Sequence, residues 1–271
     1  MELNLYRLFR LCYIPRMPLH LPPRTAERAL ALIIPAYNEA ESIGSLLEEV
    51  RLHLPDAQTI VISDGSVDDT AKIARDHGAT VLDLPCNIGV GGAVQAGMRF
   101  AWERGYGLVV RIDGDGQHPP AEIRKLLDKM DETGVDLVTG SRFLGSGDYW
   151  GSTKVRQVGN VLLAWFLSVI CHCRITDPSS GFWCVRYELL RYFSYCYPSE
   201  YPEPEALALL RRQGYEMAEA DVAIRARQFG TSTIDSLGTL YFALRVGLAL
   251  VADRVRPVDR RFAKPAQKGE N

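Results

Sequence analysis

The chain has 271 residues, of which 47% are hydrophobic and 24% charged, so it can bury a full core in one large domain or two small ones. Its 31 Lys and Arg residues against 33 Asp and Glu residues give a formal net charge of -2, which argues against a generally basic nucleic-acid binder, and no nucleic-acid partner is expected. The six cysteines form no even, closely spaced framework, so they are interpreted as reduced intracellular thiols.

No uninterrupted apolar stretch reaches the roughly 18 residues that a spanning helix needs. Two apolar segments, 158–170 and 237–251, are therefore predicted to be core helices or helices that lie in a membrane interface. Residues 1–28 mix basic and apolar side chains and are expected to form an amphipathic arm. Residues 256–271 are polar and are expected to form a mobile tail.

From Ala29 onward, short apolar runs alternate with longer helical patterns, which predicts an α/β fold with a mostly parallel sheet and helices on both faces. The expected strands are 31–34, 59–63, 79–84, 108–113 and 135–140. The expected helices of this half are one that ends near 53, then 67–78, 92–105 and 121–134. Beyond Gly140 we expect a glycine-rich loop, helices at 157–172, at 187–193 and after 201–205, and a strand-like segment at 215–227.

No low-complexity linker interrupts this series of elements. We therefore predict one domain over 29–255, with a nucleotide-type half at 29–140 and an acceptor-type half at 141–255. At the starts of the first two helices, Asn38 with Glu41 and Ser66 with Asp69 have the spacing of capping boxes. Gly78 is expected to end the second helix.

Ligands of parallel sheets bind beyond the carboxyl ends of the strands, so the loops at 35–39, 63–66, 87–92 and 113–117 are the places to look for chemistry. Asp113 and Asp115 stand two apart at the end of an apolar strand, where an extended chain points both side chains the same way. Two such carboxylates can approach one Mg²⁺ or Mn²⁺ ion together with substrate phosphates. A solvated Asp-Gly turn is the alternative reading of these residues.

The glycines at 89, 91 and 92 imitate part of a dinucleotide-binding fingerprint but lack its spacing, which disfavours a Rossmann dehydrogenase. The P-loop pattern of nucleotide hydrolases is also absent from the sequence. These glycines are therefore expected to let the backbone approach a ligand or a neighbouring segment.

Seven motifs in order resemble the family 2 glycosyltransferases of the GT-A fold. They are IPAYNEAESI, ISDGSVDDT, NIGVGGAVQAG, RIDGDGQHPPAEI, GSRF, TDPSSGF and YPEPEAL. Within that family the chain is most similar to the polyprenyl-phosphate glycosyltransferases related to dolichol-phosphate mannosyltransferase. The resemblance extends from about residue 29 to 235 and implies a hexosyltransferase that uses a UDP- or GDP-linked nucleotide sugar.

The resemblance implies roles for residues on the donor side. The nucleotide-sugar pocket would be lined by Pro35, Tyr37, Glu39, Asp64 and Asp113. The metal, Mg²⁺ or Mn²⁺, would be held by Asp113, Asp115 and Gln117, with Asp115 counted as catalytic. Ser63 departs from the family, which commonly has an acidic residue there, and a serine cannot supply the charge. Val90, at a position often basic in polysaccharide-building relatives, favours the lipid-phosphate branch.

On the acceptor side, the resemblance implies that Arg142 and Arg156 contact the acceptor phosphate and act in catalysis, with Ser180 as a further acceptor-binding residue. Guanidinium groups suit phosphate oxygens and stay charged at working pH. Asp177 is expected to shape the acceptor loop, and Arg225 and Arg227 resemble a segment that helps close the site. His118 could touch the diphosphate, but the sequence assigns it no role.

The acceptor decides the mechanism. A phosphate monoester is already an oxyanion near pH 7, with a second pKa of about 6, so it needs orientation and charge screening but no base. On that reading it attacks the anomeric carbon in line and inverts it. The alternative is a glycosyltransferase acting on a hydroxyl of a polysaccharide or glycolipid, with Glu203 or Glu205 as the base, although acidic residues also suit a helix start. A donor-binding protein without catalysis is a third reading.

The resemblance also implies a place for the protein. The acceptor would be undecaprenyl or dolichyl phosphate, used for cell-envelope glycan or glycoconjugate synthesis. Its head group lies at the bilayer surface, so the enzyme is expected to be peripheral on the cytoplasmic face of a membrane. Interface helices, or a small membrane-anchor protein as partner, would hold it there.

Overall fold

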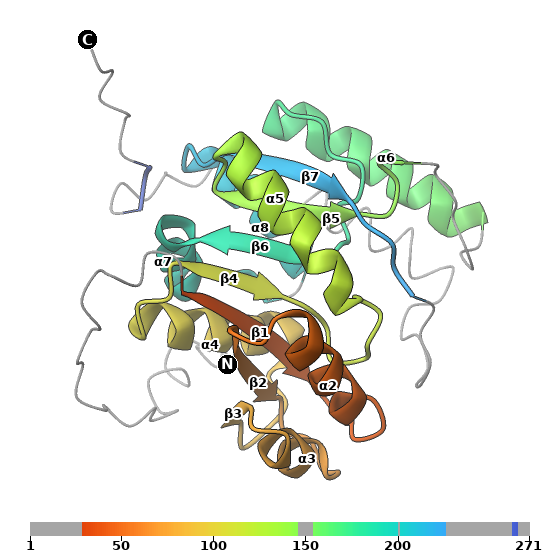
Figure 1. The fold of residues 1–271 in the computed structure, drawn as a ribbon. Coiled ribbons are helices and arrows are strands. Elements are labelled where there is room, and N and C mark those ends of the chain that lie inside the picture. Colours follow the sequence, from red (N-terminus) through yellow and green to blue (C-terminus); the bar gives the residue numbers. More distant parts are fainter. Residues whose placement is uncertain (1–28, 146–153, 200, 226–261, 265–271) are drawn as a thin grey trace, which may run out of the picture.

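The computed structural model describes residues 29–145, 154–199, 201–225 and 262–264 (Figure 1). The strands are β1 Leu30–Ala36, β2 Gln58–Ser63, β3 Thr80–Asp83, β4 Leu108–Arg111, β5 Leu137–Ser141, β6 Trp183–Arg186 and β7 Met217–Asp221. The helices are α2 Ile43–His53, α3 Thr70–Asp76, α4 Gly89–Glu103, η2 Pro120–Glu122, α5 Ile123–Thr133, α6 Lys154–Cys171, α7 Tyr187–Tyr195 and α8 Pro202–Arg212.

The strands form one sheet in the order β3-β2-β1-β4-β6-β5-β7. All neighbouring strands are parallel except β6, which is antiparallel to both β4 and β5. The prediction of a mostly parallel sheet is therefore confirmed. Strand β6 itself was not predicted, because Trp183, Cys184 and Val185 are all buried and show no alternation before α7 begins.

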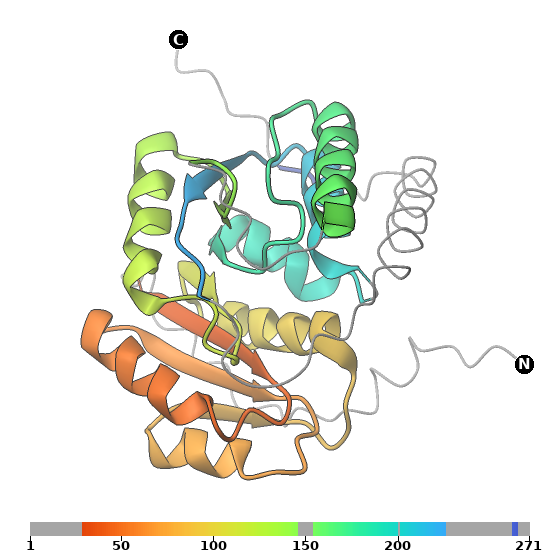
Figure 2. The same cartoon turned by 90° about the vertical axis from the view of Figure 1, so that its right-hand side faces the viewer.

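Helices cover the sheet on both faces, as predicted, and Figure 2 shows the two layers on either side of it. Alternate residues of β1 point to opposite faces, so Ile33 packs on the side of α4, α6, α7 and α8, and Leu32 on the side of α2, α3 and α5. Two apolar clusters result, one under each layer, and the central strands are buried between them.

The predicted capping boxes are wrong. The N-caps are Ser42 for α2 and Asp69 for α3, and neither makes a side-chain capping hydrogen bond. The polar residues tie two loops together instead: the Asn38 N–H donates to Ser66 Oγ, and the Val67 N–H donates to Asn38 Oδ1. The expected end of α3 is confirmed, because the helix stops just before a glycine at φ +83°.

Several predicted features lie outside the described residues, namely the arm at 1–28, the segment 237–251 and Arg227. Within the predicted tail, Phe262 packs against the ring of Tyr192, and Lys264 Nζ lies 2.7 Å from an Asp136 carboxylate oxygen. The short stretch 262–264 is therefore docked on the domain and departs from the expectation of a mobile tail.

Candidate active site

The predicted site residues gather along one edge of the sheet. The loops after β1, β2, β4, β5 and β7 leave the carboxyl ends of strands that run the same way, and the loop before antiparallel β6 arrives at that same edge. This edge is on the right in Figure 1 and faces the viewer in Figure 2. The sequence therefore predicted correctly where these loops converge.

On the donor side, neighbouring loops are joined by their backbones. The Asp64 N–H donates to the Ala36 carbonyl at 2.9 Å, and the Gly114 N–H donates to the Pro35 carbonyl at 3.2 Å. A side chain adds to these two backbone contacts: the buried Asp64 carboxylate accepts a hydrogen bond from the Ile88 N–H at 2.8 Å. Pro35 and Asp64 thus lie together in the described structure, as predicted for residues of one pocket.

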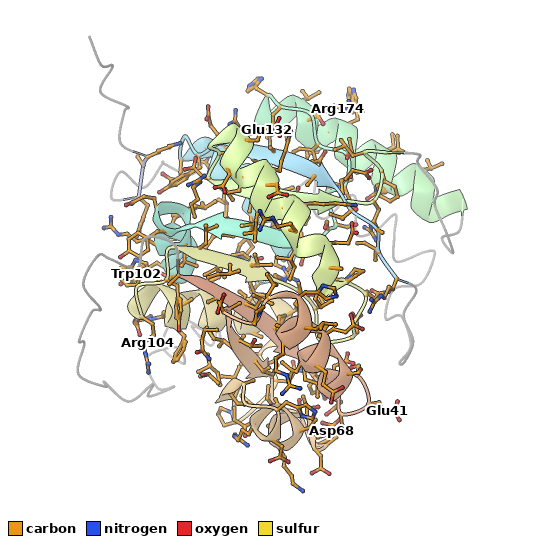
Figure 3. The ribbon with its side chains drawn as sticks, viewed as in Figure 1. Glu41, Asp68, Trp102, Arg104, Glu132 and Arg174 are labelled. Atoms are coloured by element: carbon orange, nitrogen blue, oxygen red, sulfur yellow. The ribbon has the colours of Figure 1, made fainter. Side chains whose placement is uncertain are left out.

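The rim of this side carries exposed side chains. The Tyr37 ring is 49% exposed, so it offers a flat face to a ligand. Glu39, two residues further along the loop, accepts a hydrogen bond at its Oε2 from Ser42 Oγ at 2.9 Å. Figure 3 shows Glu41 and Asp68 near each other beside α2 and α3, whereas Trp102 and Arg104 lie at the opposite edge of the sheet.

Ser63, the departure from the family pattern, is fully buried. Its Oγ has no hydrogen-bond partner among the residues that the structure describes. The position therefore presents no charge to the donor loops.

The loop after β4 differs from the extended chain that the sequence suggested. The strand ends at Arg111, and a turn at 114–116 follows, with Gly116 at φ +74°. Asp115 Oδ1 accepts a hydrogen bond from the Gln117 N–H at 3.0 Å. Asp113 and Asp115 are therefore carried by a loop and its turn, and strand alternation does not set the directions of their side chains.

The donor set of this turn fits a hard divalent cation. Asp113, Asp115 and Gln117 supply two carboxylates and an amide oxygen, the ligand types that Mg²⁺ and Mn²⁺ prefer. No group of three His, Cys, Asp or Glu side chains in the described part of the chain could hold a metal ion. The types of donor at this turn suit such a cation, but the described acidic, His and Cys side chains do not form a complete set of ligands for it.

His118, which the sequence left without a role, contacts the backbone of this loop. Its ring is buried and stacks on Phe182 with centroids 4.9 Å apart. The Asp113 N–H donates to its Nδ1 at 3.1 Å, and burial lowers the pKa of the imidazole. The ring is therefore neutral, and it holds the backbone of Asp113 in place.

On the acceptor side, a buried carboxylate holds Arg142. The Nε and Nη2 of Arg142 donate to the two carboxylate oxygens of Asp177 at 2.6 and 2.7 Å, and Nη2 also lies 2.8 Å from Ser179 Oγ. The Asp177 side chain is 0% exposed, whereas that of Arg142 is 37% exposed. Asp177 thus fixes the plane of a guanidinium that still reaches solvent.

A second carboxylate, Glu219 of β7, holds the loop that carries Asp177. Its oxygens accept hydrogen bonds from the N–H groups of Thr176 and Asp177 and from the Thr176 hydroxyl. Sequence reasoning missed Glu219, and the available signal was an acidic residue inside a short strand.

For the other two predicted acceptor-binding residues, Ser180 and Arg156, the described part of the structure shows no side chain directed at an acceptor. The Ser180 side chain is buried, its Oγ accepts from the Phe182 N–H at 3.3 Å, and its carbonyl accepts from Trp183 Nε1 at 2.6 Å. It therefore shapes the turn before β6. Arg156 lies in the first turn of α6, and its side chain is outside what the structure describes.

The two candidate bases lie in the first turn of α8, which begins within the YPEPE motif and not after it. Glu203 Oε1 is 2.8 Å from Nη2 of Arg111, a buried arginine that sequence reasoning missed. Glu205 is partly buried one position beyond Pro204. Arg225, expected to help close the site, donates its backbone N–H to the Gln117 carbonyl at 2.9 Å, so the segment that follows β7 is joined to the loop after β4.

The family model described as Glycosyl transferase family 2 matches residues 31–194. The chain belongs to the family 2 glycosyltransferases. This glycosyltransferase is 27% identical over 258 residues to the polyprenol monophosphomannose synthase of Mycolicibacterium smegmatis, covering 88% of this chain and 93% of the relative. It is 30% identical over 200 residues to the dolichyl-phosphate hexose transferase of Haloferax volcanii, covering 73% of this chain and 83% of the relative.

A solved structure of glucosyl-3-phosphoglycerate synthase from Mycobacterium tuberculosis, in complex with Mn²⁺, uridine diphosphate and glucosyl-3-phosphoglycerate, matches with a TM-score of 0.63 at 24% identity. The match covers 89% of this glycosyltransferase and 85% of that chain. The GT-A fold that the sequence predicted is therefore confirmed, as is the resemblance to polyprenyl-phosphate glycosyltransferases.

Proposed function

We propose that this glycosyltransferase transfers a sugar, with inversion, from a UDP- or GDP-linked donor to undecaprenyl or dolichyl phosphate. The observation that carries the proposal is the Arg142 guanidinium, held by buried Asp177 on the same edge of the sheet as the Asp113–Gln117 turn. An arginine oriented in this way suits a phosphate acceptor. The names of two relatives, a polyprenol monophosphomannose synthase and a dolichyl-phosphate hexose transferase, support the same acceptor class.

The donor half binds the nucleotide sugar. Pro35, Tyr37, Glu39 and Asp64 line the nucleotide pocket, and Asp113, Asp115 and Gln117 would hold Mg²⁺ or Mn²⁺. A divalent cation bound there would neutralise charge on the diphosphate leaving group. The solved relative bound to Mn²⁺ and uridine diphosphate supports a divalent cation in this fold.

The acceptor half orients the nucleophile. Arg142 and Arg156 bind the lipid phosphate, with Ser180 shaping the loop beside it. The phosphate is already an oxyanion near pH 7, so no side chain has to remove a proton. Orientation of the oxyanion and screening of its charge account for most of the rate.

The contacts of Glu203 weigh against transfer to a hydroxyl. A base must reach the proton that it removes, whereas the Glu203 carboxylate is in an ion pair with Arg111 and its side chain is 17% exposed. Glu203 is therefore a poor candidate for the base, and Glu205, which is partly buried, is the other carboxylate that transfer to a hydroxyl would need.

We also propose that α6 attaches the enzyme to the cytoplasmic face of a membrane. One stripe of this helix is apolar and more than half exposed: Val158, Val161, Leu162, Trp165 and Val169. No described helix is long and apolar enough to cross a bilayer. Since α6 also carries Arg156, a helix lying in the interface would bring the site to the acceptor head group.

The acceptor is tested by incubating the protein and MnCl₂ or MgCl₂ with a panel of UDP- and GDP-sugars and undecaprenyl phosphate, followed by mass spectrometry. We expect a glycolipid that EDTA and Asp115→Asn abolish. Arg142→Gln should lower its formation about 10- to 100-fold, the effect of one charge-assisted hydrogen bond of about 1.5–3 kcal/mol. Arg124→Gln, at a fully solvated ion pair, is the matched control. Transfer to a sugar hydroxyl without any polyprenyl product would contradict the proposal.

Membrane attachment is tested by flotation with phosphatidylglycerol-containing vesicles. The double variant Leu162→Glu and Trp165→Glu should lose flotation. Leu52→Glu, which places one negative charge on an exposed apolar position of α2, should not, and each single variant, Leu162→Glu or Trp165→Glu, matches it in charge. Binding that needs a second membrane protein, with empty vesicles ignored, would favour an anchor partner over α6.

A further inference from the structure

A buried arginine lies directly under the candidate metal-binding turn. Arg111 is the last residue of β4 and is 1% exposed. Its Nη2 is 3.2 Å from Asp113 Oδ1 and 2.8 Å from Glu203 Oε1, and its Nη1 is 3.3 Å from the Tyr197 hydroxyl. One guanidinium therefore connects the loop after β4 with the start of α8.

Stability does not explain this arginine. Taking a guanidinium out of water costs several kcal/mol, and a buried ion pair often stabilises a fold less than apolar side chains of the same size. Its Nε has no acceptor among the described residues, which adds to the cost. Burial acts to lower the pKa of Arg111, but the carboxylates of Asp113 and Glu203 outweigh it, so its pKa lies above the ordinary value and the group is charged.

The surroundings are built to keep this contact close. A Cβ at Gly181 would lie 2.8 Å from Arg111 Nη2 and 3.2 Å from Asp113 Oδ2, so only glycine lets the loop before β6 close over the pair. Trp183 is the residue of β6 that lies opposite Arg111 of β4, and its ring centroid is 5.9 Å from the guanidinium carbon. Burial raises the pKa of Tyr197, so its hydroxyl keeps its proton beside Nη1.

Two carboxylates share one nitrogen of this guanidinium. Without Arg111, no positive charge would lie between Asp113 and Glu203, and the two carboxylates would repel each other across a poorly solvated gap. An Asp113 side chain that turned away from its present direction would be a poor ligand for a cation at this turn. Arg111 thus fixes the direction of the Asp113 carboxylate.

We propose that Arg111 is a positioning residue that holds Asp113 for the donor's cation, and that Glu203 is the counter-ion that holds Arg111 and not a base. This inference rests on the proposed function for the identity of the cation site. It predicts that the effect of Arg111 is seen in cation affinity, whatever the acceptor is.

The test measures Mn²⁺ affinity from the electron paramagnetic resonance of free Mn²⁺, at saturating UDP and separately at saturating GDP. We expect Arg111→Met to weaken Mn²⁺ binding at least tenfold, and Arg111→Lys, which keeps a charge, to recover part of it. Gly181→Ala should weaken it severalfold by displacing the guanidinium. Arg124→Met, at an exposed ion pair, should bind Mn²⁺ like the wild type. Wild-type affinity in both Arg111→Met and Gly181→Ala would overturn the proposal.

Two further outcomes separate the possible failures. Glu203→Gln keeps an acceptor for Arg111, so it should lower transfer less than tenfold, whereas loss of a base would lower it about 10²- to 10⁴-fold with donor binding intact and would overturn the counter-ion role. If Arg111→Met does not fold, the Mn²⁺ affinity of Gly181→Ala decides. Failure to glycosylate polyprenyl phosphate would contradict the proposed function but leave the Mn²⁺ comparison valid.

Discussion

On the donor side of the site, the loops after β1, β2 and β4 meet through backbone hydrogen bonds, as Gly114 does with Pro35 and Asp64 with Ala36, and the buried side chains of Asp64 and Arg111 add to these contacts. On the acceptor side, buried carboxylates do the same work, with Asp177 holding Arg142 and Glu219 holding the loop of Asp177. Backbone contacts depend on the path of the chain, so many side chains can change without breaking them. A contact between buried charged side chains depends on both residues, so replacing one of them leaves the charge of the other uncompensated.

Asp177→Ala should have the largest effect. It removes the partner of Arg142 and the acceptor of the Arg142 N–H, and we expect a loss of about 3 kcal/mol in the free energy of unfolding, the low end for a broken buried pair because Arg142 is partly exposed. Urea unfolding measures this loss. Asp128→Ala, at an ion pair in which both side chains are exposed, should lose less than about 0.5 kcal/mol. Equal losses in the two variants would contradict the comparison.

Glu219→Gln should have the next largest effect. Glutamine keeps one acceptor oxygen but turns an NH₂ group toward the N–H groups of Thr176 and Asp177, so about 1.5–3 kcal/mol should be lost. The affinity for nucleotide should stay near that of the wild type, because the donor loops do not use Glu219. Glu216→Gln, an exposed position of the same segment, is the control. A variant with unchanged unfolding in urea would show that the loop is held by other contacts.

The two sides also differ in what the sequence predicted. Parallel buried strands are apolar runs that end in polar loops, so the positions of Asp64 and Asp113 at the sheet edge could be predicted. The partners of the charged residues could not, because Arg142 and Asp177 are 35 positions apart and meet only when β6 inserts as an antiparallel strand. In the sequence, Arg111 has the pattern of a polar residue at the end of an apolar strand, and no neighbouring residue indicates that its side chain contacts Glu203 of α8.

Ser42→Ala tests the donor side, where we expect a smaller change. The Ser42 hydroxyl is buried and donates to the Gly114 carbonyl at 2.8 Å, which links the N-cap of α2 to the turn after β4. Its loss should cost about 1 kcal/mol in urea unfolding and raise the KM for the nucleotide sugar more than it lowers kcat. Ser45→Ala, one turn further along α2 and exposed, is the control. A loss as large as that of Asp177→Ala would remove the distinction between the two sides.

Asp68→Asn should have the smallest effect, and one that depends on pH. The Asp68 carboxylate accepts hydrogen bonds from the Ala40 N–H and from Thr70, joining the loops after β1 and β2 at the exposed rim. Burial is the largest single influence and raises the pKa of Asp68, but the hydrogen bonds together outweigh it and bring the pKa below its ordinary value of 3.8. The unfolded chain then binds more protons than the native one just below that value, so the stabilisation is complete above pH 3.8 and is lost as the pH falls further.

Urea unfolding of the wild type and Asp68→Asn should therefore differ at pH 6 and converge toward pH 3. Asp69→Asn, next in sequence, removes a carboxylate that makes no capping hydrogen bond and should show no such convergence. A difference for Asp68→Asn that stays constant with pH would mean that its carboxylate stabilises the rim by shape alone. In that case the stability of the exposed rim on the donor side would depend on backbone conformation and not on the charge of Asp68, in contrast to the charge-dependent contact of Asp177 with Arg142.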